Sequence, residues 1–138
     1  MIIDATNMVL GRLATKAAKM ALLGERVNVI NCEKAIITGP KKVTIGRYLQ
    51  RRDRGEPTHG PFISRLPDRI VRRTIRGMLP YKRERGQSAF KRVMCYIGVP
   101  EKLKDQKAET VDGADMAKLP TLKYVTILEL SRQLGAKI

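Results

Sequence analysis

Short apolar runs alternate with longer periodic segments along the N-terminal third of this chain. Residues 1–6 and 27–32 are apolar runs typical of buried strands, and residues 35–38 form a third such run. Between the first two, residues 9–23 repeat apolar side chains at the spacing of an amphipathic helix. The apolar face of that helix consists of Leu10, Leu13, Ala14, Ala17, Met20 and Ala21. Strand, helix and strand in this order predict a βαβ unit, and hence a parallel pair of strands in an α/β domain.

The middle of the chain carries helical patterns interrupted by one long aperiodic segment. Gly39 and Pro40 break the chain, and a helix is expected over residues 41–52. Residues 53–66 contain two glycines and two prolines without a hydrophobic period, which predicts a long functional loop. Pro67 suits the first turn of a helix over residues 67–78, and a short basic helix is expected at 85–92.

The C-terminal third combines one more strand with a capped helix. Residues 94–99 are apolar and predict a last core strand, whereas residues 100–120 are polar and rich in turn residues. Thr126 and Glu129 have the spacing of a capping box, which predicts a final helix from Ile127 to Leu134. A length of 138 residues fits a single domain, and we treat the whole chain, 1–138, as one.

Charge changes this picture, because it is concentrated in the middle of the chain. The net charge is +15, and residues 41–92 carry 16 basic and 4 acidic side chains. Self-repulsion of this size indicates a polyanionic partner, with nucleic acid favoured and a membrane surface as the alternative. No apolar run is long enough to cross a bilayer, and the first residues lack the pattern of a signal peptide. We therefore expect a cytoplasmic protein with no membrane partner.

The sharpest candidate for binding is the helix expected at residues 67–78. Arg69, Arg72, Arg73 and Arg76 fall within an arc of about 100° on a helical wheel. The opposite side of the same helix consists of Ile70, Val71, Thr74, Ile75 and Met78. A solvated charged face is the ordinary explanation for such a row, but these four arginines repel one another and only Asp68 lies nearby in sequence. Phosphate groups would supply the missing counter-charge, and the planar guanidinium suits them.

Further cations flank this helix in sequence. The loop at residues 80–86 contains a glycine beside cations, an arrangement that lets backbone approach phosphates, although a flexible solvated turn is the alternative. Its cations are Lys82, Arg83 and Arg85. We expect further cations to border the same surface, although the sequence alone does not show that they face the same way: Lys41, Lys42, Arg51, Arg52 and Arg54. His59, in the long loop, is either an RNA contact or a hydrogen-bonded surface group.

Little in the sequence supports catalysis or a cofactor. Cys32 and Cys95 each lie in an apolar run and are expected as buried reduced thiols, with a single disulfide as the alternative. Together with His59 they are too few and too widely spaced for a zinc site. Residues 39–42 contain a glycine and two lysines but lack the other elements of a phosphate loop. We therefore expect that the protein is not an enzyme and that it binds neither a cofactor nor a small-molecule substrate.

The residues alone thus favour a basic α/β domain that binds RNA or DNA. Two other functional classes remain as alternatives to a structural protein that binds nucleic acid. The first is an RNA-modifying or nucleotide-using enzyme on an α/β scaffold, which would require a catalytic group that the sequence does not offer. The second is a free regulator that binds RNA. Only two phenylalanines, four tyrosines and no tryptophan are present, which argues against a protein that binds single strands by stacking their bases on aromatic rings.

Several segments resemble the universal large-subunit ribosomal protein thirteen family. They are DATNMVLGRLAT from Asp4, VINCEKAIITG up to Gly39, RLPDRIVRRTIRGMLPYK from Arg65 to Lys82, and RGQSAFKR followed by YIGVP. The most specific are LGRLA and RGMLP, and the likeness covers nearly the whole chain, least clearly in residues 100–120. His59, Gly60 and Pro61 make it more similar to the archaeal branch of the family.

This resemblance implies a fold, a partner and a set of residues. It implies an α/β domain with a small, mainly parallel four-stranded sheet between helices, without enzymatic activity. It implies large-subunit rRNA as the partner, bound during assembly, with neighbouring large-subunit ribosomal proteins around it. The basic stretch that faces RNA in the family maps onto Arg65, Arg69, Arg72, Arg73, Arg76, Lys82, Arg83 and Arg85.

Overall fold

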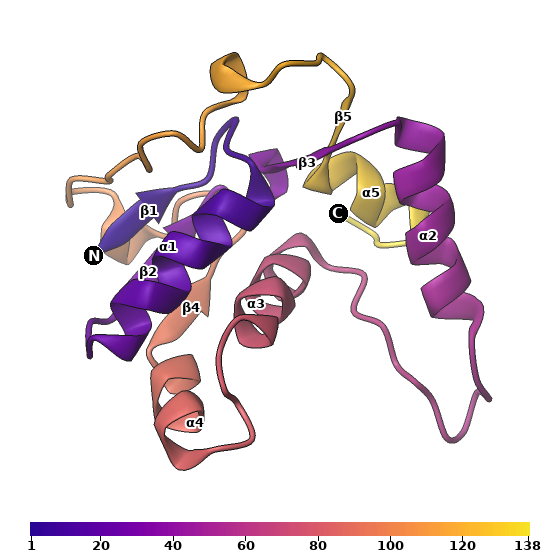
Figure 1. Cartoon of the computed structure of the whole chain (residues 1–138), viewed down its shortest axis with the longest axis horizontal. Coiled ribbons are helices and arrows are strands. Elements are labelled where there is room, and N and C mark those ends of the chain that lie inside the picture. Colours follow the sequence, from indigo (N-terminus) through magenta and orange to yellow (C-terminus); the bar gives the residue numbers. More distant parts are fainter.

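The predicted βαβ unit forms the centre of the molecule. In the computed structural model, which describes residues 1–138, it consists of β1 (Ile2–Asp4), α1 (Leu10–Leu22) and β2 (Val27–Ile30). β1 and β2 are parallel, and β2 also pairs in parallel with β4 (Val93–Cys95), so the strand order is β1-β2-β4. Helix α1 runs alongside this sheet (Figure 1). The α/β class is therefore confirmed.

The third strand leaves this sheet, so the expectation of one four-stranded sheet is wrong. β3 (Ile36–Thr38) pairs antiparallel with β5 (Tyr124–Thr126), a strand that the sequence analysis missed. The chain turns away after β2 because Asn31 adopts a left-handed φ of +54° and the short 3-10 helix η1 (Cys32–Lys34) follows. The molecule thus has a three-stranded parallel sheet and a separate two-stranded antiparallel one.

Polar residues 100–120 return to the sheet and cover its β1 edge. The segment contains two 3-10 helices, η2 (Glu101–Leu103) and η3 (Met116–Lys118). Between them, the backbone N–H of Glu109 donates to the carbonyl of Ile2 at 2.8 Å, and Asp4 N–H donates to the Glu109 carbonyl at 3.1 Å. This pairing uses only backbone groups, so the polar side chains of the segment gave no sign of it.

Four further helices complete the fold close to their predicted positions. They are α2 (Lys41–Asp53), α3 (Pro67–Gly77), α4 (Glu84–Lys91) and α5 (Ile127–Gln133). Contacts join α1 with α3 and α4, and α3 with both β4 and α5. Helix α2 stands at the other side of the molecule and connects to α3 through the long loop (Figure 1). Its apolar side chains that face the core, Ile45, Tyr48 and Leu49, are only partly buried.

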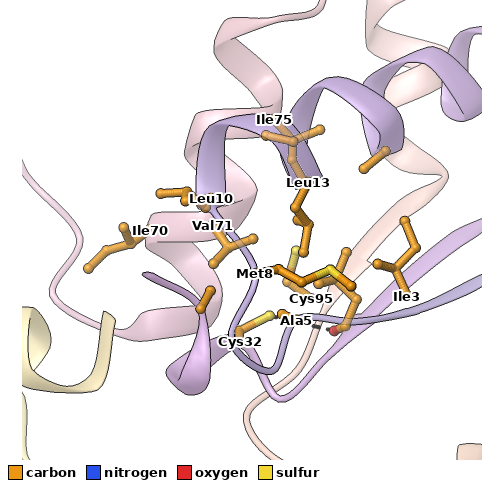
Figure 2. Packing of buried hydrophobic residues seen from close by; sticks show 14 of the residues in the cluster. Ile3, Ala5, Met8, Leu10, Leu13, Cys32, Ile70, Val71, Ile75 and Cys95 are labelled. Carbon is orange, nitrogen blue, oxygen red and sulfur yellow. Dashed lines mark hydrogen bonds between the residues drawn. The ribbon is translucent and has the colours of Figure 1, made fainter. Parts of the chain in front are cut away.

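The hydrophobic core forms mainly where α1 meets α3 and the parallel sheet. The predicted apolar face of α1 is buried, with Met20 partly buried and Ala18 added to it. Figure 2 shows Leu10 and Leu13 of α1 facing Val71 and Ile75 of α3. One cluster of 25 buried residues collects side chains from the N-terminal unit, α3, α4, β4 and α5. A single core therefore fixes α3 on the N-terminal unit.

A carboxylate links the C-terminal ends of β1 and β2. One oxygen of Asp4 accepts hydrogen bonds from the Thr6 backbone and hydroxyl and from the Asn31 amide, at 3.0, 2.7 and 3.0 Å. Partial burial acts to raise the pKa of Asp4, but the hydrogen bonds from Asn31 and Thr6 outweigh it and the pKa is lowered. These hydrogen bonds hold the segment that follows β1 against the end of β2.

The two cysteines are buried and unbridged at the ends of β2 and β4. Cys32 and Cys95 both lie in the core beside Met8 (Figure 2), and neither forms a disulfide. A hydrogen bond with Cys95 and burial both raise the pKa of the Cys32 thiol, which disfavours a reactive thiolate. The sulfur atoms therefore serve as packing groups, as expected from the sequence.

A first prediction tests the direction in which α1 faces. Leu13 is fully buried in the core. Leu13→Ala should lower the free energy of unfolding by about 2–5 kcal/mol, because it deletes packed atoms and leaves a cavity. Lys16→Ala, on the exposed side of the same helix, is the matched control and should change stability by less than about 0.5 kcal/mol. Urea unfolding of both variants measures the difference, and equal effects would contradict the packing.

A second prediction concerns the cap of α5. The Thr126 hydroxyl oxygen accepts a hydrogen bond from the Glu129 backbone N–H at 3.2 Å, which confirms the predicted N-terminal cap. Thr126→Ala should destabilise the protein by about 0.5–2 kcal/mol, since that N–H loses its partner. Thr126→Ser keeps the oxygen and should retain most of the stability. Thermal unfolding compares the two variants, and an equal loss in both would assign the effect to packing instead.

Candidate nucleic-acid interface

The orientation of α3 is set by the side chains that it buries. Ile70, Val71 and Ile75 are buried in the core, and Figure 2 shows Val71 and Ile75 beside α1. The opposite stripe therefore faces outward, and it consists of Arg69, Arg72, Arg73 and Arg76. We call these four residues the arginine face. Met78 departs from the sequence prediction, because it follows the last helical turn and is 42% exposed.

No acidic side chain neutralises the arginine face. The molecule contains only two ion pairs, Lys41 with Glu129 and Arg52 with Asp53. Asp68, the acidic neighbour in sequence, forms no ion pair with any of the four arginines. Like charges three and four residues apart on a helix are destabilising, so the row is costly to the free protein. An anionic ligand would remove that cost.

Aromatic rings hold two of the four guanidinium groups in place. The Arg72 guanidinium lies 4.5 Å from the centre of the Phe90 ring, and that of Arg76 lies 5.0 Å from the Tyr81 ring. Such cation–π contacts contribute about 0.5–1 kcal/mol each at exposed sites. The Nε atom of Arg72 is buried and has no hydrogen-bond partner. The rings orient the cations without cancelling their charge.

A groove of about 430 Å³ opens over the arginine face, and two others adjoin it. Its lining comprises the four arginines with Phe62, Ser64 and Phe90. A second groove, of about 470 Å³, lies at the α2 end of the long loop and includes Arg52, Arg54 and Arg65. A third lies between α2 and α3, where Arg51 and Arg73 line a space of about 320 Å³. Eight of the sequence-predicted cations thus line adjoining grooves.

The remaining sequence-predicted residues lie apart from these grooves. Lys41 and Lys42 occupy the opposite end of α2 from the long loop, and Lys41 is paired with Glu129 of α5. His59 is exposed in the long loop and makes no hydrogen bond through its side chain. Arg85 lines a different groove, of about 590 Å³, between α1 and α4. Lys82 and Arg83 are exposed between α3 and α4.

The structure adds residues that the sequence analysis did not select. Phe62, Phe90 and Tyr81 surround the arginine face, and the only sequence signal for them was the presence of aromatic residues close to the arginine run. A further basic groove is lined by Arg26, Asn28, Ser88, Lys91, Arg92 and Met94. Arg26 is distant in sequence from the other cations, so pattern alone did not connect them.

Other site classes have no counterpart among these residues. No three His, Cys, Asp or Glu side chains come together as a potential metal site. In the glycine–lysine segment at residues 39–42, Gly39 N–H already donates to the Lys123 carbonyl at 2.8 Å. Lys41 of that segment is engaged by Glu129. None of the helices combines the length and apolar character needed to cross a membrane.

Comparison with known proteins identifies the family. The model of the family described as Ribosomal protein L13 matches residues 1–102, which include the arginine face and the long loop. The chain belongs to the ribosomal protein L13 family. Large ribosomal subunit protein uL13 of Methanopyrus kandleri is 53% identical over 97% of this chain and 86% of its own length.

Relatives from other archaea agree with this assignment. The uL13 proteins of Methanococcoides burtonii and Haloarcula marismortui are 48% and 43% identical, over 99% and 98% of this chain. They cover 98% and 90% of their own lengths, so the similarity is not confined to one motif. The resemblance to the archaeal branch is confirmed. Membership of the L13 family makes the chain a structural ribosomal protein rather than an enzyme.

Proposed function

We propose that this L13 family protein binds and stabilises large-subunit rRNA during assembly, through the surface centred on the arginine face. The observation that carries the proposal is a row of four arginines with no acidic partner, fixed outward by the burial of the opposite side of α3. Phosphate oxygens match this need for negative charge and accept the forked hydrogen bonds of guanidinium groups. In this proposal the chain acts in the cytoplasm as part of the ribosome, beside neighbouring large-subunit proteins.

We assign the residues of this surface to a central and an outer group. The central group lines the three adjoining grooves: Arg51, Arg52, Arg54, Arg65, Arg69, Arg72, Arg73 and Arg76. The outer group extends the basic surface: Lys41, Lys42, His59, Lys82, Arg83 and Arg85. Folded RNA presents phosphates in several directions, so adjoining grooves suit its shape better than one flat strip does.

The competing proposal is a free RNA-binding regulator. Both kinds of protein would use the same basic surface, so the surface itself does not separate them. Sedimentation of a native lysate does: a ribosomal component should appear almost wholly with the large subunit, whereas a regulator should remain largely free. Membership of a ribosomal protein family favours the first outcome.

A third prediction concerns the dependence of RNA affinity on salt. Lysines and arginines that neutralise phosphates release bound counterions, so affinity for a large-subunit rRNA fragment should fall steeply as salt rises. The expected slope of log affinity against log salt is about −0.7 to −0.9 for each phosphate neutralised. Filter binding between low and high salt measures this slope. An affinity that hardly changes with salt would contradict a phosphate-binding surface.

A fourth prediction tests the arginine face. The double change Arg69→Gln and Arg76→Gln keeps helix propensity and most of the side-chain length. It should weaken RNA binding by at least about tenfold, because each charged hydrogen bond contributes roughly 1.5–3 kcal/mol. Stability should stay nearly constant, since loss of the Arg76 contact with Tyr81 is offset by reduced repulsion.

The matched control for this test removes the same charge elsewhere. Lys102 and Lys104 are exposed in and beside η2, outside the grooves, and changing both to Gln should affect RNA affinity much less. Isothermal titration with the rRNA fragment, together with the salt slope, compares the two double variants. Equal losses in both would mean that total charge, and not the arginine face, governs binding. Unfolding of the arginine variant would instead make those side chains structural.

A further inference from the structure

Phe62 is the most exposed aromatic residue of the protein. It lies in the long loop between α2 and α3, and 72% of its surface is accessible to solvent. Removing an apolar ring from water is favourable, so an exposed phenylalanine is a place where a partner can gain affinity. The loop that carries Phe62 connects α2 with α3, which stand apart in the fold (Figure 1).

The ring stands between two basic grooves. Phe62 lines the groove of the arginine face, and it also lines the groove that contains Arg52, Arg54 and Arg65. The two grooves together have seven arginines but only two acidic residues, Asp53 and Glu56. Asp53 is already paired with Arg52. An exposed aromatic ring is thus flanked on two sides by arginines, of which only Arg52 forms an ion pair.

The backbone that carries this ring is fixed. The Phe62 carbonyl accepts a hydrogen bond from Nη1 of Arg73 at 3.2 Å, which ties the loop to α3. The ring also packs on Gly60, where a β-carbon would come within 3.2 Å of two ring atoms. Gly60 has a φ of +85°, a conformation that favours glycine. A tied backbone beneath an exposed ring is preorganised for contact.

We propose that Phe62 stacks on the base of one unpaired RNA nucleotide, while arginines of the two grooves bind the phosphates on either side of it. This rests on the proposed function and specifies the RNA structure that the surface recognises, a bulge or junction rather than a continuous duplex. An unpaired base offers its π-face directly, whereas a paired base must first be unstacked. The single ring is consistent with a chain poor in aromatics, since it serves one base and not a strand.

The same surroundings disfavour a protein as the partner of Phe62. An apolar protein surface over this ring would also cover the guanidinium groups of both grooves and remove them from water. Burying unpaired charges is costly. RNA supplies a flat apolar base and phosphates at the same place, which satisfies both the ring and the cations.

The experiment compares two RNA hairpins with the full-length protein. One carries a single unpaired 2-aminopurine in its stem, and the other has the same 2-aminopurine paired with uridine. The fluorescence of the bulged probe should fall when the protein binds, because the base stacks on the ring. Phe62→Leu should weaken binding of the bulged hairpin by at least about fivefold and leave the paired hairpin within about twofold. Phe62→Tyr keeps an aromatic face and should bind the bulged hairpin like the unchanged protein.

Leu122→Ala provides the matched control, because Leu122 is 87% exposed and lies in the segment before β5. The Leu122→Ala change should leave the affinity for both hairpins unaltered. Base stacking is wrong if Phe62→Leu keeps its affinity for the bulged hairpin, or if it loses affinity equally for both hairpins. If Phe62→Leu binds both hairpins normally but is bound more weakly by other ribosomal proteins, Phe62 contacts a protein and the base-stacking proposal is wrong. If the double change Arg69→Gln and Arg76→Gln leaves the affinity for both hairpins unchanged, the proposed function is wrong, whatever the outcome for Phe62.

Discussion

The burial of the apolar stripe of α3 against α1 and the parallel sheet is the constraint on which the rest of the surface depends. Ile70, Val71 and Ile75 each contribute roughly 1.5–3 kcal/mol when buried. Repulsion between like charges on one helix face costs only about 0.2–0.5 kcal/mol for each pair. Burial therefore outweighs the repulsion, and the arginines remain aligned outward even without a ligand. Helix α3 thus contributes one side to the core and the other side to the charged surface.

Aromatic rings give this charged surface a defined geometry without lowering its charge. Phe90 and Tyr81 hold the guanidinium groups of Arg72 and Arg76. An acidic side chain would hold these guanidinium groups as firmly, but it would compete with the phosphates that we propose as ligands. Arg73 acts differently, because its hydrogen bond to the Phe62 carbonyl fixes the loop that contributes the exposed ring. The loop and the helix thus form one surface with preorganised cations.

The remainder of the chain acts as a scaffold for α3. The segment around Glu109 covers the free edge of β1, and so removes an exposed row of backbone donors and acceptors. The antiparallel pair β3–β5 carries α5 to a position beside α3. The charge distribution matches this division, because residues 41–92 hold +12 of the net charge of +15.

The sequence alone determined the features that depend on local geometry. Helical periodicity placed the faces of α1 and α3, and the cap at Thr126 followed from residues three apart, because a helix fixes the direction of each side chain. Tertiary structure decided which strand β3 pairs with, how residue 109 covers the sheet, and where Phe62 lies between the two basic grooves. These features join residues that are distant in sequence through backbone hydrogen bonds and packing. No periodic pattern encodes such contacts, so only the folded chain reveals them.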